Sequence, residues 1–133
     1  MPGIAALLVM ALMGPQAVPP SEKASRTAAE KKISSQLLYE IYRAKGQAKQ
    51  KGVPTESTIV KVDAKQRALV DVRAPVTQTL TRELARLGGT IVSTSPEANS
   101  VIAWVPLLSL ERLAEGPSVQ AIQPALEPIY NKR

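Results

Sequence analysis

The sequence contains no cysteine, no histidine and no phenylalanine, and it has only one tryptophan and three tyrosines among its 133 residues. The lack of cysteine excludes a disulfide framework, but it is compatible with both cytosolic and exported proteins. Without histidine or cysteine, the usual nucleophile–base pairs and most transition-metal sites cannot be assembled. The composition therefore predicts a binding protein rather than an enzyme, with no catalytic residues, no metal and no cofactor.

The net charge of +6 is confined to one part of the chain. Residues 21–67 carry the whole excess of lysine and arginine, whereas residues 68–133 carry equal numbers of acidic and basic side chains. An alternative function, binding of nucleic acid or of an anionic surface, would use the basic side chains of the first predicted helix: Lys31, Lys32, Arg43, Lys45, Lys49 and Lys51. Few aromatic rings are present to stack on bases, so nucleic acid is disfavoured as a partner and a solvated basic helix is the simpler interpretation.

Residues 1–27 are predicted to be a signal-like apolar segment and a linker. The apolar run from Ile4 to Met13 is much shorter than the roughly 20 residues that span a bilayer, and its length is typical of the apolar region of a secretory signal. Gly14 and Ala17 are small residues that would suit cleavage, although no lysine or arginine precedes the run. We expect the protein to be exported, to the periplasm or outside the cell.

Residues 28–52 are predicted to form an amphipathic helical arm. Apolar residues recur there at a spacing of three to four, as one face of a helix requires. The stripe consists of Ile33, Leu37, Leu38, Ile41 and Tyr42. Gly52 and Pro54 end the helix, and the usual role of such a stripe is packing against the rest of the domain.

Residues 53–125 are predicted to form a ferredoxin-like α+β domain, and residues 126–133 an extended tail. The β-branched runs at 58–62 and 68–73 form a hairpin around a polar turn. A helix at 77–87, strands at 90–94 and 100–105, a short helix from 106 and a strand at 119–122 follow. From residue 67 to residue 123 this order is βαββαβ, which predicts an antiparallel sheet with two helices on one face, preceded by the extra hairpin strand and the helical arm.

One strand of this sheet carries the single tryptophan. Alternation within residues 100–105 places the smaller side chains on one face and Ile102 and Trp104 on the other. The smaller set suits the face that helices cover, so we expect Ile102 and Trp104 on the open face, with Leu69 as a neighbour. A tryptophan on a bare sheet is a typical interface anchor. The alternative is that the stripe of the helical arm covers this face.

Three stretches resemble the N-terminal prodomain that precedes the catalytic domain in bacterial subtilisin-like serine proteases. They are KISSQLLYEIYRAKG at 32–46, ALVDVRAPVT at 68–77, and LARLGGTIVSTSPEANSVIAWVPLLSLERLAEGPSVQAIQPA at 84–125. The resemblance covers about residues 32–126, and it depends on the order and spacing of the whole rather than on a single motif. It implies the ferredoxin-like fold, and a function as inhibitor and intramolecular chaperone of a subtilisin-like protease, acting in cis or in trans.

The resemblance also implies how a partner is bound. In that family the open sheet face packs on two surface helices of the protease, an acidic residue in the turn between the middle strands caps those helices, and the C-terminal tail occupies the substrate cleft. The corresponding residues here are Glu97 in the turn, Ile102 and Trp104 on the face, and Gln123, Pro124 and Ala125 at the start of the tail. Since no catalytic domain follows, we expect a free-standing inhibitor or chaperone, or a truncated or split gene product. A third alternative is an oligomer that pairs its open faces through Trp104.

Overall fold

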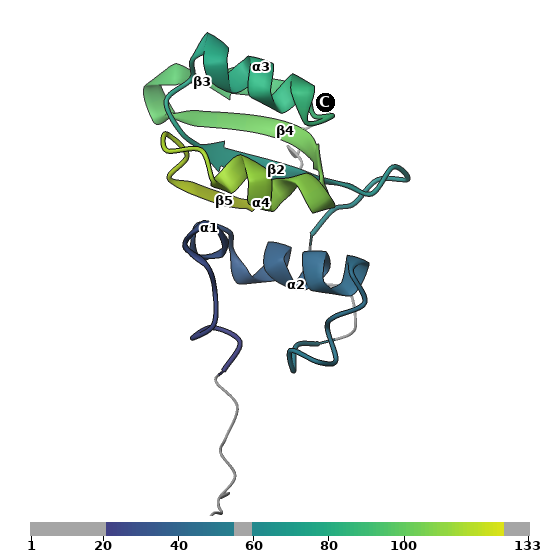
Figure 1. The fold of residues 1–133 in the computed structure, drawn as a ribbon. Coiled ribbons are helices and arrows are strands. Elements are labelled where there is room, and N and C mark those ends of the chain that lie inside the picture. Colours follow the sequence, from purple (N-terminus) through teal and green to yellow (C-terminus); the bar gives the residue numbers. More distant parts are fainter. Residues whose placement is uncertain (1–20, 55–59, 127–133) are drawn as a thin grey trace, which may run out of the picture.

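The computed structural model describes residues 21–54 and 60–126, which form an α+β fold on a four-stranded antiparallel sheet (Figure 1). The strands are β2 (Arg67–Arg73), β3 (Thr90–Ser95), β4 (Ser100–Pro106) and β5 (Ala121–Pro124). Their order across the sheet is β3-β4-β2-β5, and every neighbouring pair is antiparallel. Strand β4 therefore separates β2 from β3, although these two strands follow one another in the chain.

Helices after β2 and β4 cover one face of this sheet (Figure 1). They are α3 (Gln78–Arg86) and α4 (Leu110–Ala114), the latter preceded by the 3-10 turn η3 (Leu107–Ser109). Helix α3 begins where the Thr77 side chain accepts a hydrogen bond from the Leu80 N–H, and it ends just before Gly88, whose φ of 93° is readily available only to glycine. These boundaries lie within one residue of the helix predicted at 77–87.

The helical arm consists of two helices, α1 (Ala28–Lys31) and α2 (Ser35–Ala44), where the sequence predicted one. Between them Ile33 forms a parallel bridge with Ile122 of β5, because the Lys32 carbonyl accepts from the Ile122 N–H and the Ser34 N–H donates to the Ile122 carbonyl. The Ser34 side chain then caps α2. Pairing with β5 thus interrupts a segment whose apolar spacing alone fits one continuous helix.

The arm shares one hydrophobic core with the sheet and its two covering helices. Fully buried members of this core come from all three parts: Leu37, Leu38 and Ile41 from the arm, Val70, Val72, Val101 and Val105 from the sheet, and Leu84 and Leu110 from the covering helices. Burial of each such side chain stabilises the fold by about 1.5–3 kcal/mol. The arm is therefore part of the folded body.

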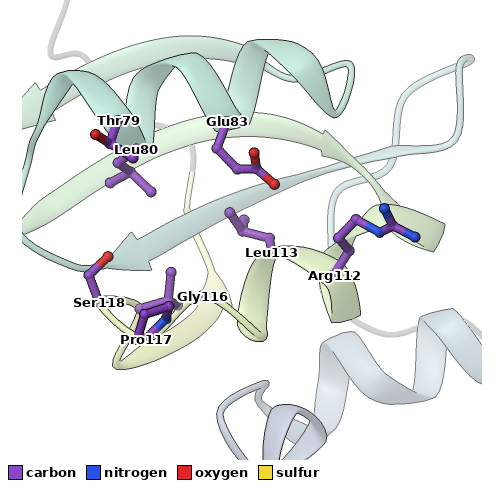
Figure 2. A pocket seen from close by; sticks show the side chains of 9 residues that line it. Thr79, Leu80, Glu83, Arg112, Leu113, Gly116, Pro117 and Ser118 are labelled. Atoms are coloured by element: carbon purple, nitrogen blue, oxygen red, sulfur yellow. The ribbon is translucent and has the colours of Figure 1, made fainter.

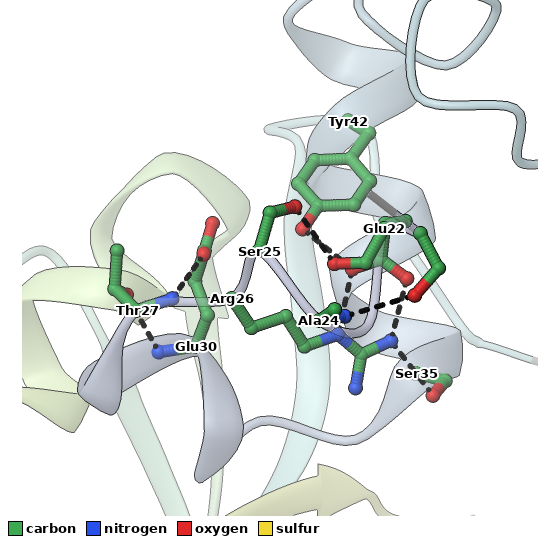
Figure 3. A network of polar contacts seen from close by, with 9 residues as sticks. Glu22, Ala24, Ser25, Arg26, Thr27, Glu30, Ser35 and Tyr42 are labelled. Atoms are coloured by element: carbon green, nitrogen blue, oxygen red, sulfur yellow. Dashed lines mark hydrogen bonds and ion pairs between the residues drawn. The ribbon is translucent and has the colours of Figure 1, made fainter. Parts of the chain in front are cut away.

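A polar network fastens the segment before α1 to helix α2 (Figure 3). The Glu22 carboxylate accepts from Nε and Nη2 of Arg26, at 2.6 and 2.9 Å, and from the Tyr42 hydroxyl at 2.9 Å. Arg26 also donates to the Ser35 hydroxyl at 3.0 Å. Glu22 and Arg26 expose only 7% and 11% of their side chains, so this ion pair is largely shielded from water.

Two expected strands differ from the sequence prediction. The last strand lies at Ala121–Pro124 rather than at 119–122, because Val119 turns into the core and its N–H closes a turn with the Gly116 carbonyl. In the expected hairpin, Val62 makes an isolated bridge with Ala68, and residues 55–59 lie outside the described part. Residues 1–20 of the predicted signal-like segment and linker (1–27), and residues 127–133 of the predicted tail (126–133), also lie outside it. Among the described residues, none of the helices has the length and apolar character needed to cross a membrane.

Candidate functional site

The candidate site is the sheet face opposite α3 and α4, called the open face below. Antiparallel register arranges its residues in three rows across the strands. These rows are Thr90, Trp104 and Leu69; Ser93, Ile102, Asp71 and Gln123; and Ser95, Ser100, Arg73 and Ala121. The first two rows bring together four residues that the sequence singled out, from three different strands.

The apolar part of the open face is separate from the main core. Leu69, Ile102 and Trp104 are not members of the core cluster, whereas the arm residues Ile41 and Tyr42 are. Leu69 is only 3% exposed, but Ile102 and Trp104 are half-buried and keep part of their surface accessible. The arm stripe thus belongs to the core side of the sheet, and Figure 1 shows no helix of the described residues on the side of the sheet opposite α3 and α4.

Paired polar groups lie at both ends of this apolar part. The Asp71 carboxylate accepts from the Ser100 hydroxyl at 2.7 Å and lies 3.2 Å from the Arg73 guanidinium. At the other end, Arg67 donates to Asp63 at 2.8 Å and to the Thr90 hydroxyl at 2.9 Å. Each of these carboxylates already has hydrogen-bond donors, so they fix the shape of the face rather than act as free acids or bases.

Glu97 lies in the 3-10 turn η2 (Pro96–Ala98) between β3 and β4, as the sequence placed it. Asn99 closes this turn in the left-handed conformation, with φ of 51°. The Glu97 side chain is exposed and makes no hydrogen bond or ion pair with any described residue. Its charge is therefore available to a partner at the rim of the sheet.

The three residues expected to begin the extended tail are instead bound to the sheet. Gln123 and Pro124 belong to β5, and the Ala125 N–H donates to the Leu69 carbonyl at 3.0 Å. Gln123 lies on the open face opposite Asp71, whereas Pro124 lies opposite Val70 on the face that the helices cover. Their placement at the start of a free tail was wrong, because β2 already pairs with this segment.

Sequence reasoning missed a hollow of about 240 Å³ between α3 and α4 (Figure 2). Leu80 and Leu113 form its floor, and Pro117 closes one side, so it is mostly apolar. Glu83 lies at its rim, and two hydrogen bonds from Arg86 hold the pKa of this carboxyl below its ordinary value. In the sequence, the only indication of this hollow was that the second covering helix is short and ends at Gly116-Pro117. It lies on the helix-covered side, away from Trp104.

Most of the basic side chains that would serve the alternative function have partners within the chain. Lys32 bonds to the Gly116 carbonyl, Arg43 to Glu40 and the Pro54 carbonyl, Lys45 to Glu111, and the Lys51 ammonium lies 4.7 Å from the centre of the Tyr42 ring. A cation already paired with a carboxylate attracts phosphate less strongly. Of the six, Arg43 and Lys45 are therefore the ones whose charge is neutralised by a carboxylate.

Within residues 21–54 and 60–126, no group of three or more His, Cys, Asp or Glu side chains is placed to hold a metal ion. Compared with protein-family models, curated proteins and solved structures, the chain matches none. A functional inference therefore depends on the chemistry of the open face itself.

Proposed function

We propose that this chain is a protein-binding module of the prodomain type, which inhibits a subtilisin-like serine protease or assists its folding. One observation carries the proposal: Ile102 and Trp104 keep accessible surface on a sheet face that no helix of the described residues covers. We also propose that the sheet is ferredoxin-like. The strand order β3-β4-β2-β5, with one helix after β2 and one after β4, supports this assignment.

The contact would be centred on Trp104. Aromatic anchors near the middle of an interface contribute most of its energy, since they bury a large area with little loss of side-chain entropy. Trp104 lies beside Leu69. The Leu69 side chain is only 3% exposed, so it is tightly packed and supports the indole. A flat apolar face of this kind fits the exposed surfaces of two helices in a partner.

Glu97 would make the polar part of the contact. A carboxylate without an internal partner is stabilised at the N-terminus of a helix, where backbone N–H groups are unpaired. Glu97 lies in the turn after β3 and has no competing ion pair among the described residues. It is therefore suited to cap the helices on which the face packs.

The part of the chain that enters the substrate cleft would be residues 127–133, since the sheet already holds Gln123 to Ala125. An extended segment in a cleft is bound by main-chain hydrogen bonds, and alternate side chains give specificity. The proposal includes export of the protein, because the apolar run of residues 4–13 has the length of a secretory signal.

Inhibition of a subtilisin-like protease tests the proposal. We expect the full chain to inhibit the enzyme, and Trp104→Ala to raise the inhibition constant by about 30-fold or more, the loss typical of a central aromatic anchor. Leu108→Ala is the matched control, since Leu108 is 62% exposed but lies in η3 rather than on the open face. Deletion of 127–133 leaves β5 intact and should remove most of the inhibition.

Two results would contradict the proposal. Undiminished protease activity at high micromolar concentrations of the chain would exclude inhibition. Equal inhibition by the wild type and Trp104→Ala would exclude the open face as the contact. Circular dichroism and urea unfolding of each variant separate lost binding from lost folding.

A further inference from the structure

Two buried residues of the open face lie outside the main core. Among the described apolar residues that are buried, only Leu69 and Ala125 do not belong to the core cluster, and they are 3% and 9% exposed. Strand pairing places them side by side. Val70 lies opposite Pro124, so the next pair along the two strands is Leu69 with Ala125, and the Ala125 N–H donates to the Leu69 carbonyl at 3.0 Å. Both residues therefore lie on the open face, in the row of Trp104.

The burial of these two side chains needs a covering element. Trp104 and Ala125 flank Leu69 within the row, but side chains stand perpendicular to a sheet, so neighbours in the row leave their tips open to water. No helix of the described residues lies on this side of the sheet (Figure 1). The low exposure of Leu69 and Ala125 therefore indicates a further apolar contact on the open face.

We propose that residues 127–133 of the same chain fold back over this part of the open face, with Ile129 and Tyr130 against Trp104. The chain leaves the sheet at Ala125, within the row itself, so the following residues start beside the side chains that are covered. Neighbouring strands lie about 4.8 Å apart, which places Trp104 roughly 10 Å from Ala125 across the sheet. Four or five extended residues of about 3.3 Å each span that distance. Ile129 and Tyr130 are the fourth and fifth residues after Ala125, and they are the large apolar residues of the segment.

The other segment of this chain that lies near the sheet and outside the described residues, 55–59, is a poorer occupant. Val53 before it and Val60 after it both belong to the core cluster, so both of its ends lie on the core side of the sheet. To cover Leu69 it would have to pass around the sheet edge and return within five residues. The tail has no such constraint, and Pro128 favours its departure from the edge, because proline has no N–H with which to continue the pairing to β2.

The cover regulates the contact of the proposed function. Residues 127–133 cannot lie on Trp104 and in a substrate cleft at the same time, so a protease has to release them from the face. The free energy of that release lowers the apparent affinity of the chain for its partner. Ile102 lies in the next row and is half-buried, so part of the face stays accessible while the tail is in place. This regulatory role rests on the proposed function, whereas the cover itself does not.

The emission of the single tryptophan tests the cover without a protease. Deletion of 127–133 should shift the emission of folded Trp104 to longer wavelength and raise its acrylamide quenching constant, because the indole gains contact with water. The double variant Ile129→Ser, Tyr130→Ser keeps the chain length and should have the same effect. Asn131→Ser, Lys132→Ser is the matched control, since it changes polar residues of the same segment and should alter neither quantity. Circular dichroism confirms that each variant is folded.

Cross-linking gives a second measurement that leaves Trp104 and its immediate cover unchanged in length. The natural chain has no cysteine, so Thr90→Cys, Tyr130→Cys introduces one thiol in the row beyond Trp104 and one in the tail. Mild oxidation should form a disulfide within one chain, because the cover brings the two Cα atoms within the 4.4–6.8 Å or so that a disulfide requires. Leu108→Cys, Tyr130→Cys is the control and should stay largely reduced, since Leu108 is 62% exposed but lies in η3 rather than on the open face.

Unchanged emission and quenching in both tail variants, together with no disulfide between positions 90 and 130, would overturn the proposal. So would a change of emission that Ile59→Ser produces and the tail variants do not, since that result assigns the cover to 55–59. A tail effect that disappears on dilution would assign the cover to a second copy. Failure of the proposed function is distinguishable: a chain that shows the tail effect but inhibits no protease keeps the cover and loses the function, and inhibition without a tail effect does the reverse.

Discussion

At the scale of single residues, the turn before β2 contains a conformation that its side chain does not favour. Gln66 has a φ of 61°, in the left-handed region that suits glycine. The turn persists because the Asp63 carboxylate accepts from the backbone N–H groups of Lys65 and Arg67, both at 2.9 Å. In addition, the Gln66 carbonyl accepts from the Leu107 N–H at 3.0 Å. Surrounding hydrogen bonds thus hold Gln66 in a strained geometry.

Gln66→Gly should therefore stabilise the protein by about 0.5–1 kcal/mol, since relief of the left-handed strain exceeds the added flexibility of the unfolded chain. The free energy of unfolding in urea measures the effect. The control Lys65→Gly should lower the free energy of unfolding. Lys65 does not have a positive φ, so glycine relieves no strain there and only increases the conformational entropy of the unfolded chain. A less stable Gln66→Gly variant would show that the glutamine side chain contributes more than the backbone strain costs.

The sequence predicted this polar turn but not which of its residues carries the strain. A left-handed position is normally marked by glycine, asparagine or aspartate, and the turn after β3 follows that pattern with Asn99. Nothing in the local sequence marks Gln66, whose conformation is fixed by Asp63 within the turn and by Leu107 from a distant segment.

At the scale of elements, local signals sufficed for α3 but not for the arm. Leu80 and Leu84 at helical spacing, with the Thr77 cap and Gly88, describe α3 almost to the residue. In the arm, Ile33 fits the same helical stripe, yet its backbone pairs with β5. Because that partner is far away in the sequence, periodicity alone could not predict the break, although the Thr27–Glu30 capping box and the Ser34 cap mark two helix starts.

Close contact between α3 and β4 requires glycine at position 89. A Cβ atom there would lie 2.9 Å from the Leu84 carbonyl oxygen and 3.0 Å from the Trp104 carbonyl oxygen. Both neighbours are backbone atoms, so the helix or the strand has to move to make room. We expect Gly89→Ala to destabilise the protein by about 1–3 kcal/mol, the usual range for overpacking.

The fluorescence of the single tryptophan distinguishes this cause from general destabilisation. Displacement of β4 in Gly89→Ala should shift the emission of folded Trp104, whereas Gly46→Ala should leave it unchanged. Gly46 is a suitable control because its φ of 72° imposes backbone strain but no atom lies within 4 Å of the added Cβ. Identical spectra for both variants would mean that β4 stays in place and that the alanine is accommodated elsewhere.

At the scale of the whole molecule, sheet register determines which residues share the candidate site. Alternation along one strand placed Ile102 and Trp104 on the same face, and this much was available from the sequence. The neighbours of these two residues could not be predicted from the sequence, because Asp71 and Gln123 join the row of Ile102 only through pairing between strands distant in sequence. The same pairing binds the segment at 123–125 that the sequence pattern left free.

The Glu22 network connects the beginning of the described chain to the core and predicts a pH dependence of the global stability. Hydrogen bonds from Arg26 lower the pKa of the Glu22 carboxyl below its ordinary value of 4.5, against the opposing effect of burial. Burial, together with the bond to Glu22, raises the pKa of Tyr42, which therefore remains a protonated donor. The stabilisation from Glu22 is fully present above about pH 4.5 and is lost as the pH falls through the lower pKa of the folded state.

Glu22→Gln should consequently destabilise the protein by about 1–3 kcal/mol at pH 7, because Arg26 loses a charged acceptor in a largely shielded site. At pH values low enough to protonate Glu22 in the folded wild type, both proteins are neutral at this position, so the difference in unfolding free energy between them should shrink with acidification. Glu83→Gln is the control: the Glu83–Arg86 pair is solvent-exposed, and its removal should have a much smaller effect at every pH. A Glu22→Gln penalty that stays constant from pH 7 to pH 3 would mean that the carboxylate charge does not hold the segment to α2, and that packing around Tyr42 does so instead.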